Sequence, residues 1–315
     1  MKKILLPVLS FVFILPVIAQ QSVNLRLNPE KNKTYRLRSV SHQTVLQTVS
    51  GNQQTVESDV IYSFSLKMLD ATPEFMVAEV HFDTLITKTN TMGRVETISS
   101  ADEGDIKSSE ASKVMSYIMN KLSKNAVFVK LNYAGQPLEI INAKILSDLI
   151  LKDTASITLS EPAASALKTQ IINTVSENNL KTMIKNFTWH LPAAQVSKGT
   201  EWKIYDQINS GGMLLMVSSK FRLEGLNGNN ALITVESEIK VPENAPPIKS
   251  AGATVTYNSL TGMGKSNMVV DTETGLLVEN KTQTRITGNL SISAPGFSME
   301  MPMDINGETV VRAVK

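Results

Sequence analysis

Two hydrophobic patterns alternate along this sequence, and their order limits the folds that the chain can adopt. Over residues 59–68, apolar and polar side chains alternate with a period of two, as in a strand with one buried face. Over residues 111–122, apolar residues recur three and four positions apart, as in an amphipathic helix. The period of two returns after Trp202. This order predicts a helical region between two β-rich regions.

Turn-forming residues divide the alternating regions into strands. After residues 59–68, a turn that contains Pro73 leads to a second alternating segment at residues 76–82, and the two predict a β-hairpin. A short strand pair is expected around Gly135. Beyond Trp202, further segments with one apolar and one polar face lie at residues 213–223, 231–241 and 276–286.

Capping residues mark three more helices in the central region. Asn142 is expected to cap a second helix that ends near Ile150. A third helix is expected to begin at Ser160, and Ser176 is expected to cap a fourth. Pro192 ends the helical region, since proline cannot continue a helix.

The predicted fold class is α+β. Antiparallel β-sheets from the N- and C-terminal halves form a curved half-barrel or a sandwich-like structure, with a central block of amphipathic helices packed on one side. We expect one domain over residues 20–315, with halves at about 24–141 and 192–315 and the helical block at about 103–190.

A short motif occurs near the start of each half and suggests an internal duplication. Residues 31–37 (KNKTYRL) and 198–204 (KGTEWKI) share a basic residue, a turn former, two polar residues, an aromatic, a basic residue and an aliphatic residue. Asn32 and Gly199 fill the turn position, and these two residue types adopt left-handed backbone most readily. The alternative is a chance likeness between two β segments, because few residue types carry such a pattern.

Four segments in a fixed order carry a resemblance to a known family. They are NKTYRLR (32–38), VKLNYAGQPLEII (129–141), KGTEWKI (198–204) and VVDTETGLLVENKTQTRITG (269–288). As an ordered set they resemble a family of exported bacterial proteins known only as a domain of unknown function, although Asn32 stands where that family would have glycine. The resemblance implies a β-rich envelope protein and supplies no catalytic residue.

The first residues have the pattern of a secretory signal peptide. Lys2 and Lys3 precede an apolar run that ends at Ala19, where we expect cleavage. The run is shorter than a membrane span, so no integral span is expected after cleavage, and an uncleaved anchor is the alternative. The chain contains no cysteine and has no lipid acceptor of the lipoprotein type. We therefore expect an exported protein, in the periplasm or on the extracellular side of the envelope, that is not a lipoprotein.

The charge balance argues against nucleic acid as a partner. The chain has 31 basic and 29 acidic residues, and two of the basic ones, Lys2 and Lys3, leave with the signal peptide. The neutral mature chain has no basic patch to bind phosphates.

Motifs for catalysis or metal binding are weak. His42, His81 and His190 lie far apart, without the spacing of metal ligands. Ser165 and Lys168 match an S-x-x-K pattern, but the other motifs of that enzyme class are missing from the sequence. We therefore name no catalytic, cofactor-binding or metal-binding residue, expect no cofactor, and expect that the protein is not an enzyme.

Two minor motifs remain. Met299, Met301 and Met303 share one strand face, where thioethers suit Cu(I), but their spacing favours core packing. Thr84 and Thr154 each follow an aspartate in a short O-glycosylation pattern, so each is a candidate for modification only if it is exposed, and a chance match is the alternative.

Two functions fit these patterns. The first is binding of a hydrophobic small molecule or lipid in an apolar groove between the sheet and the helices, because the inward faces are rich in Met, Leu, Ile and Val. The second is a structural or protein-interaction module of the envelope with a filled core. The low aromatic content of 5% favours the first.

Overall fold

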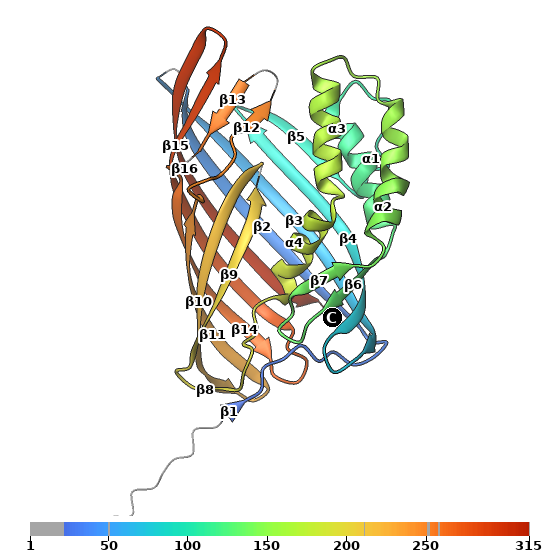
Figure 1. Cartoon of the computed structure of the whole chain (residues 1–315), viewed down its shortest axis with the longest axis vertical. Coiled ribbons are helices and arrows are strands. Elements are labelled where there is room, and N and C mark those ends of the chain that lie inside the picture. Colours follow the sequence, from blue (N-terminus) through green and yellow to red (C-terminus); the bar gives the residue numbers. More distant parts are fainter. Residues whose placement is uncertain (1–21, 50, 211, 251–252, 258, 315) are drawn as a thin grey trace, which may run out of the picture.

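The computed structural model describes residues 22–49, 51–210, 212–250, 253–257 and 259–314, and the expected signal peptide lies outside them. Most strands of the described chain join one antiparallel sheet of 14 strands, which curves around part of the helical region (Figure 1). The fold is therefore the predicted α+β class with a half-barrel sheet. Among the described residues, no helix is both long enough and apolar enough to cross a bilayer.

The strand order joins both ends of the sequence in the middle of the sheet. The path runs β7 (Pro137–Ile140), β6 (Val127–Leu131), β4 (Met76–Thr91), β3 (Asn52–Ala71), β2 (Thr34–Val49), β16 (Phe297–Val314), β15 (Leu277–Ala294), β14 (Thr261–Asp271), β11 (Asn230–Lys240), β10 (Met213–Asn227) and β9 (Glu201–Ser210). Beside this path lie β5 (Arg94–Ser99), β12 (Ile248–Ser250) and β13 (Ala253–Thr256), while β1 (Ser22–Val23) pairs with β8 (Val196–Ser197). The two end strands, β7 and β9, are not paired with each other, so the half-barrel has an opening.

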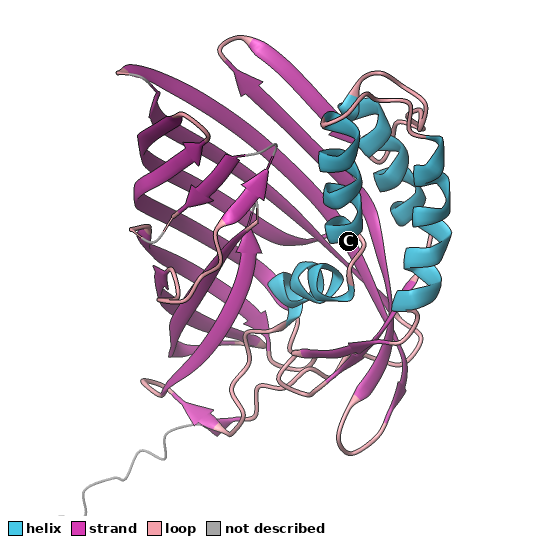
Figure 2. Ribbon diagram, turned by 45° about the horizontal axis from the view of Figure 1, so that its top comes forward, coloured by secondary structure: helices cyan, strands magenta, loops and turns pink. Residues whose placement is uncertain are grey.

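The helices lie at this opening. They are α1 (Ala111–Ser123), α2 (Ala143–Leu151) with a 3₁₀ turn (Lys152–Ser156), α3 (Ala163–Thr174) and α4 (Glu177–Thr188). Figures 1 and 2 show α1, α2 and α3 along one margin of the sheet and α4 within its curve. All four match the helices predicted from the spacing of apolar residues.

The two predicted caps have different outcomes. The hydroxyl of Ser176 accepts a hydrogen bond from the backbone N–H of Asn179 at 3.3 Å and caps α4 as expected. Asn142 is the N-cap residue of α2, as predicted, but its side chain makes no cap bond. Its Oδ1 instead accepts from the N–H of Phe128 and its Nδ2 donates to the carbonyl of Ala126, each at 2.9 Å. Asn142 therefore ties the start of α2 to β6.

The main hydrophobic core fills one end of the curved sheet. Phe64 on β3 is completely buried and stacks on Phe187 of α4, with ring centroids 4.7 Å apart and ring planes 9° apart. The ring of Phe82, on the neighbouring strand β4, lies 6.2 Å from that of Phe64. Leu180 and Ile184 place the rest of the apolar face of α4 in the same core. This face of α4 is therefore covered by the sheet.

A glycine sets the contact between α4 and the turn that joins β6 to β7. Gly135 has a φ of 88°, and a Cβ atom there would lie 1.9 Å from the carbonyl oxygen of Thr188. The carbonyl of Gly135 accepts a hydrogen bond from the Thr188 hydroxyl at 2.7 Å. Both the backbone angle and the close approach require glycine at this position.

A second, smaller apolar cluster lies further along the sheet, under the β12–β13 hairpin. Its buried residues are Tyr257, Leu260 and Leu290, and the partly buried residues around them include Met213, Ile248, Ile286, Met301 and Met303. Met301 and Met303 of β16 thus pack against apolar side chains, as their spacing favours. Met299 pairs with Ile292 further along the same ladder.

Between the two clusters, the inner face of the sheet is polar. Hydroxyl pairs cross from strand to strand at Ser41–Thr309 (2.8 Å), Ser266–Thr282 (2.7 Å) and Ser219–Ser237 (2.8 Å). Near them, Oδ1 of Asn280 is buried without a hydrogen-bond partner among the described residues. We call these seven residues the polar belt. The inner face is therefore not uniformly apolar.

The repeated motif has the expected backbone. Asn32 and Gly199 have φ angles of 62° and 86°, both left-handed. Tyr35 and Trp202 are each the second residue of their strands, β2 and β9. The ring of Trp202 stacks on that of Phe221, with centroids 5.4 Å apart. The duplication and the division into halves stay predictions, because a shared turn conformation does not by itself establish a repeat.

Candidate functional site

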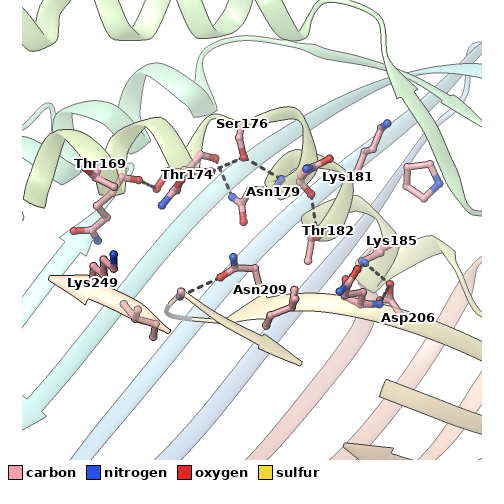
Figure 3. A pocket seen from close by; sticks show the side chains of 18 of the residues that line it. Thr169, Thr174, Ser176, Asn179, Lys181, Thr182, Lys185, Asp206, Asn209 and Lys249 are labelled. Carbon is pink, nitrogen blue, oxygen red and sulfur yellow. Dashed lines mark hydrogen bonds and ion pairs between the residues drawn. The ribbon is translucent and has the colours of Figure 1, made fainter. Parts of the chain in front are cut away.

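A cleft of about 1290 Å³ opens between helices α3 and α4 and the unpaired edge of the sheet. Strand β9 and the short strand β12 form its other side (Figure 3). The cleft lies in the opening of the half-barrel, because β9 is the last strand of the sheet path. This cleft is the candidate functional site.

The helices line this cleft with their polar faces. On α3, Leu167 and Ile171 are buried, while Thr169, Gln170 and Asn173 face the cleft. An amphipathic helix gains most by burying its apolar side chains, so the polar side remains for the opening. On α4, in the same way, the apolar side chains are buried and polar side chains line the cleft. The lining along the helices is therefore polar, which differs from the apolar groove expected from the sequence.

The charged residues of the cleft are largely neutralised by ion pairs. Lys181 lies 2.7 Å from Glu177, and its hydrogen bond lowers the pKa of the Glu177 carboxyl. Lys185 lies 2.5 Å from Asp206 on β9. Lys249 makes no ion pair with a described residue, and Figure 3 shows it at the opposite end of the cleft from Lys185.

The pair of Lys185 and Asp206 also protects the free edge of β9. The ammonium group of Lys185 donates to the carbonyl of Gln207 at 3.2 Å, and Asp206 accepts from the Gln207 N–H at 2.7 Å. In a strand, the N–H and C=O of one residue point to the same side, so both free groups of Gln207 are satisfied by side chains. This arrangement discourages pairing with a foreign strand at that position.

This pair supplies a testable prediction about stability. Replacing Lys185 with methionine leaves Asp206 without its partner, at a position where the two side chains are only 12% and 22% exposed. We expect the free energy of unfolding to fall by about 1–3 kcal/mol, as measured by urea denaturation. The matched control is Lys144→Met on α2, whose ion pair with Asp148 is 86% and 65% exposed. Equal losses from the two variants would contradict the proposed role of Lys185.

Several amide side chains in the cleft are available to a ligand. Gln170, Asn173, Asn178 and Gln207 line it, and their side chains make no hydrogen bond to any described residue. By contrast, the hydroxyls of Thr169, Thr174 and Thr182 already donate to carbonyls one helical turn earlier. We call the four free side chains the amide group.

Apolar side chains join the lining of the cleft beside β12, where Lys249 also lies. Leu214 and Ile248 line it there, and Ile248 also packs against the second apolar cluster. The polar cleft is thus next to the cluster that contains Met213, Met301 and Met303. A single elongated ligand would meet polar groups along the helices and apolar groups beside β12.

The candidate residues from the sequence do not converge on this site. Ser165 lines the cleft, and its backbone N–H donates to Oε2 of Glu161 at 3.1 Å. Hydrogen bonds from Ser165 lower the pKa of the Glu161 carboxyl, and among the described residues no hydrogen bond joins Ser165 to Lys168. His42 and His81 are 2.8 Å from Asp59 and Glu79, respectively, on different strands. In the part of the chain that the structure describes, no three His, Cys, Asp or Glu residues are placed to hold a metal ion.

The two threonines of the glycosylation pattern are half-buried. Thr84 lies on β4, and Thr154 lies in the 3₁₀ turn, where its hydroxyl donates to the carbonyl of Leu151 at 2.7 Å. Neither contributes to the cleft. Sequence reasoning missed the cleft itself, although the concentration of Asn, Gln and Thr on the outer face of α3 was a signal for it.

Comparison with known proteins identifies a family. The model of a family of unknown function, DUF6263, matches residues 74–277. The chain belongs to this family. The region matched to DUF6263 includes every residue that lines the cleft. No protein with curated annotation matches the chain in sequence.

Solved structures show only distant likeness to this DUF6263 member. Lipovitellin, in a structure concerned with lipid–protein interactions, has a TM-score of 0.46 and 11% identity, over 91% of this chain and 25% of that chain. The OccK11 (OpdR) protein of Pseudomonas aeruginosa has a TM-score of 0.24 and 7% identity, over 94% of this chain and 100% of its own. A DUF1329 family protein from Desulfovibrio piger has a TM-score of 0.14 and 8% identity, over 88% of this chain and 84% of its own. This chain spans about a quarter of the lipovitellin chain, and scores this low assign no function.

Proposed function

We propose that this protein is an exported, non-enzymatic binding protein of the cell envelope whose ligand is an amphiphilic, lipid-like molecule. The polar part of the ligand occupies the cleft between α3, α4 and β9. The apolar part lies at the end formed by Leu214 and Ile248, against the second apolar cluster.

The observation that carries this proposal is the change of lining along one cleft. Polar side chains line it along the helices, whereas Leu214 and Ile248 line the end next to the cluster of Met213, Met301 and Met303. Burying a wholly apolar molecule along the polar helices would leave amides and hydroxyls without partners, which costs free energy. A wholly polar molecule would gain nothing from the apolar end. Methionine side chains also adapt to ligands of varied shape.

The sequence supports the location and the absence of catalysis in this proposal. Lys2, Lys3 and the apolar run up to Ala19 support export. The lone S-x-x-K pattern at Ser165 lacks its companion motifs, and among the described residues no hydrogen bond joins Ser165 to Lys168. Ligand binding without chemistry is therefore the simplest activity for the cleft.

The proposal is tested with a fluorescent diacylglycerol added to the purified protein. We expect saturable binding that weakens about tenfold in an Ile248→Glu variant, because the charge would be buried against the acyl chains. The control is Leu232→Glu, on a partly exposed position of β11 that does not line the cleft. Absence of saturable binding by the wild-type protein, or equal weakening in both variants, would overturn the proposal.

The second candidate is a structural or protein-interaction module with a filled core. The main core, in which Phe64 is completely buried and contacts the rings of Phe82 and Phe187, favours this candidate. The side chain of Tyr205 on β9, which is 65% exposed, offers an aromatic contact for a partner protein, whereas the free backbone groups of Gln207 on the same strand are already bonded. Native mass spectrometry of protein purified from its own host separates the two, because a module of this kind would carry no lipid.

A further inference from the structure

The chemistry of the cleft narrows the class of ligand. We infer that the polar part of the ligand is an uncharged polyhydroxyl group, such as the sugar headgroup of a glycolipid, and not a phosphate or a carboxylate. This inference rests on the proposed function and adds to it the chemical identity of the headgroup.

The charges in the cleft disfavour an anionic headgroup. Lys181 and Lys185 line it, but Glu177 and Asp206 already neutralise them at 2.7 and 2.5 Å. An anion beside either lysine would also lie beside the paired carboxylate, and the like charges would repel. Lys249 is the remaining cation of the described lining, and it makes no ion pair with a described residue. It is exposed, as the four residues of the amide group are, so water and salt screen its charge.

The amide group matches hydroxyl groups in its hydrogen-bonding capacity. Each side chain of Gln170, Asn173, Asn178 and Gln207 offers two N–H donors and a carbonyl acceptor. A hydroxyl both donates and accepts, so two neighbouring hydroxyls of a sugar can bond to both ends of one amide. A phosphate or carboxylate only accepts, and it would leave the amide oxygens facing negative charge.

The amide group also surrounds the space from two sides. Gln170 and Asn173 lie three positions apart on α3, where residues with this spacing share a face. Asn178 lies in the first turn of α4, and Gln207 lies on β9 across the cleft. A headgroup with hydroxyls around its ring can therefore reach amides on both sides at once.

Two aromatic side chains and the cleft volume fit the same class. Trp189 and Tyr205 line the cleft, and an aromatic ring offers a flat apolar surface to the C–H face of a sugar ring. The volume of about 1290 Å³ exceeds the usual range for small-molecule pockets, which is roughly 300–1,000 Å³. The space accommodates a disaccharide together with part of its lipid.

The test compares three probes by isothermal titration calorimetry below their micellar concentrations. Dodecyl maltoside and dodecyl phosphate have the same alkyl chain and differ in the headgroup, and free maltose has the headgroup alone. We expect dodecyl maltoside to bind at least about tenfold more tightly than dodecyl phosphate, and maltose to bind more weakly than dodecyl maltoside.

Matched variants connect the preference to the amide group. Asn173→Leu is expected to weaken dodecyl maltoside binding about tenfold and to leave the weak dodecyl phosphate binding unchanged. The control Asn267→Leu makes the same change on an exposed position of β14 outside the cleft and should have no effect. Thermal unfolding of both variants shows whether each is folded.

Each outcome has a distinct meaning. Equal or tighter binding of dodecyl phosphate, or equal effects of Asn173→Leu and Asn267→Leu, would overturn the headgroup inference and leave the proposed function standing. Binding of maltose as tight as that of dodecyl maltoside would support the headgroup inference and contradict an amphiphilic ligand. Absence of binding by all three probes would overturn both.

Discussion

Replacing Phe64 with alanine is expected to lower the free energy of unfolding by about 3–5 kcal/mol. The side chain is completely buried, and its ring stacks on Phe187 of α4 and lies 6.2 Å from Phe82 of β4. Its removal loses apolar burial and leaves a cavity between two rigid elements, the sheet and α4, that cannot easily close. Urea denaturation followed by circular dichroism measures the loss.

The same experiment includes two controls for the role of Phe64. Phe297→Ala changes a side chain that is 52% exposed near the β15–β16 turn, and it should lower the free energy of unfolding far less. A double-mutant cycle with Phe187→Ala should give a coupling of about 1 kcal/mol, because the two rings stack directly. A loss at Phe64 no larger than the loss at Phe297 would contradict the described core.

Acidification from pH 6.5 toward pH 4 is expected to cost about 3 kcal/mol of stability through His190 alone. Burial lowers the pKa of this imidazole from 6.5 to about 4, because the folded protein disfavours the charged form. Its Nε2 lies 3.1 Å from the carbonyl of Gly275, which raises the pKa only partly back. The unfolded chain takes up the proton first as the pH falls. The contribution of His190 is thus complete above pH 6.5 and is lost as the pH falls through 4.

A difference experiment isolates this effect from the carboxylates, which also titrate in acid. The free energy of unfolding of the wild-type protein and of a His190→Gln variant is measured by urea denaturation between pH 8 and pH 4. The difference in free energy of unfolding between wild type and His190→Gln should decrease by about 3 kcal/mol as the pH falls from 8 to 4. His42 gives the opposite sign, because its hydrogen bond to Asp59 raises the pKa. A constant gap between wild type and His190→Gln would show that His190 is not buried in neutral form.

The helices and strands were predictable from sequence because their signals are local. The spacing of apolar residues that marks α1 depends on neighbours three and four positions away, and the cap at Ser176 depends on Asn179. Asn142 makes no cap bond for a non-local reason, since its side chain bonds to Ala126 and Phe128 at β6. In the sequence, an asparagine whose side chain bonds to another element cannot be distinguished from one that caps a helix.

The site was less predictable because a pattern shows which side of an element is apolar and not what covers it. The apolar side of α4 suggested the wall of a groove, but Phe187 packs it into the main core. The polar side, which reads as a solvated surface, lines the cleft instead.

The polar belt was missed for a related reason. Serine and threonine at inner positions, such as Ser41 and Thr309, satisfy each other across strands that the sequence does not show to be neighbours.

The pairing of β2 with β16 has a consequence for how the chain reaches its native state. Ser41 and Thr309 face each other in the middle of the sheet although 268 residues separate them. Long-range ladders of this kind form late, because the chain must lose the entropy of a very large loop before the contact stabilises it. Nearly the whole polypeptide must therefore leave the ribosome before β16 can pair with β2 and β15. Until then, the unpaired edges of β2 and β15 would be accessible to chaperones.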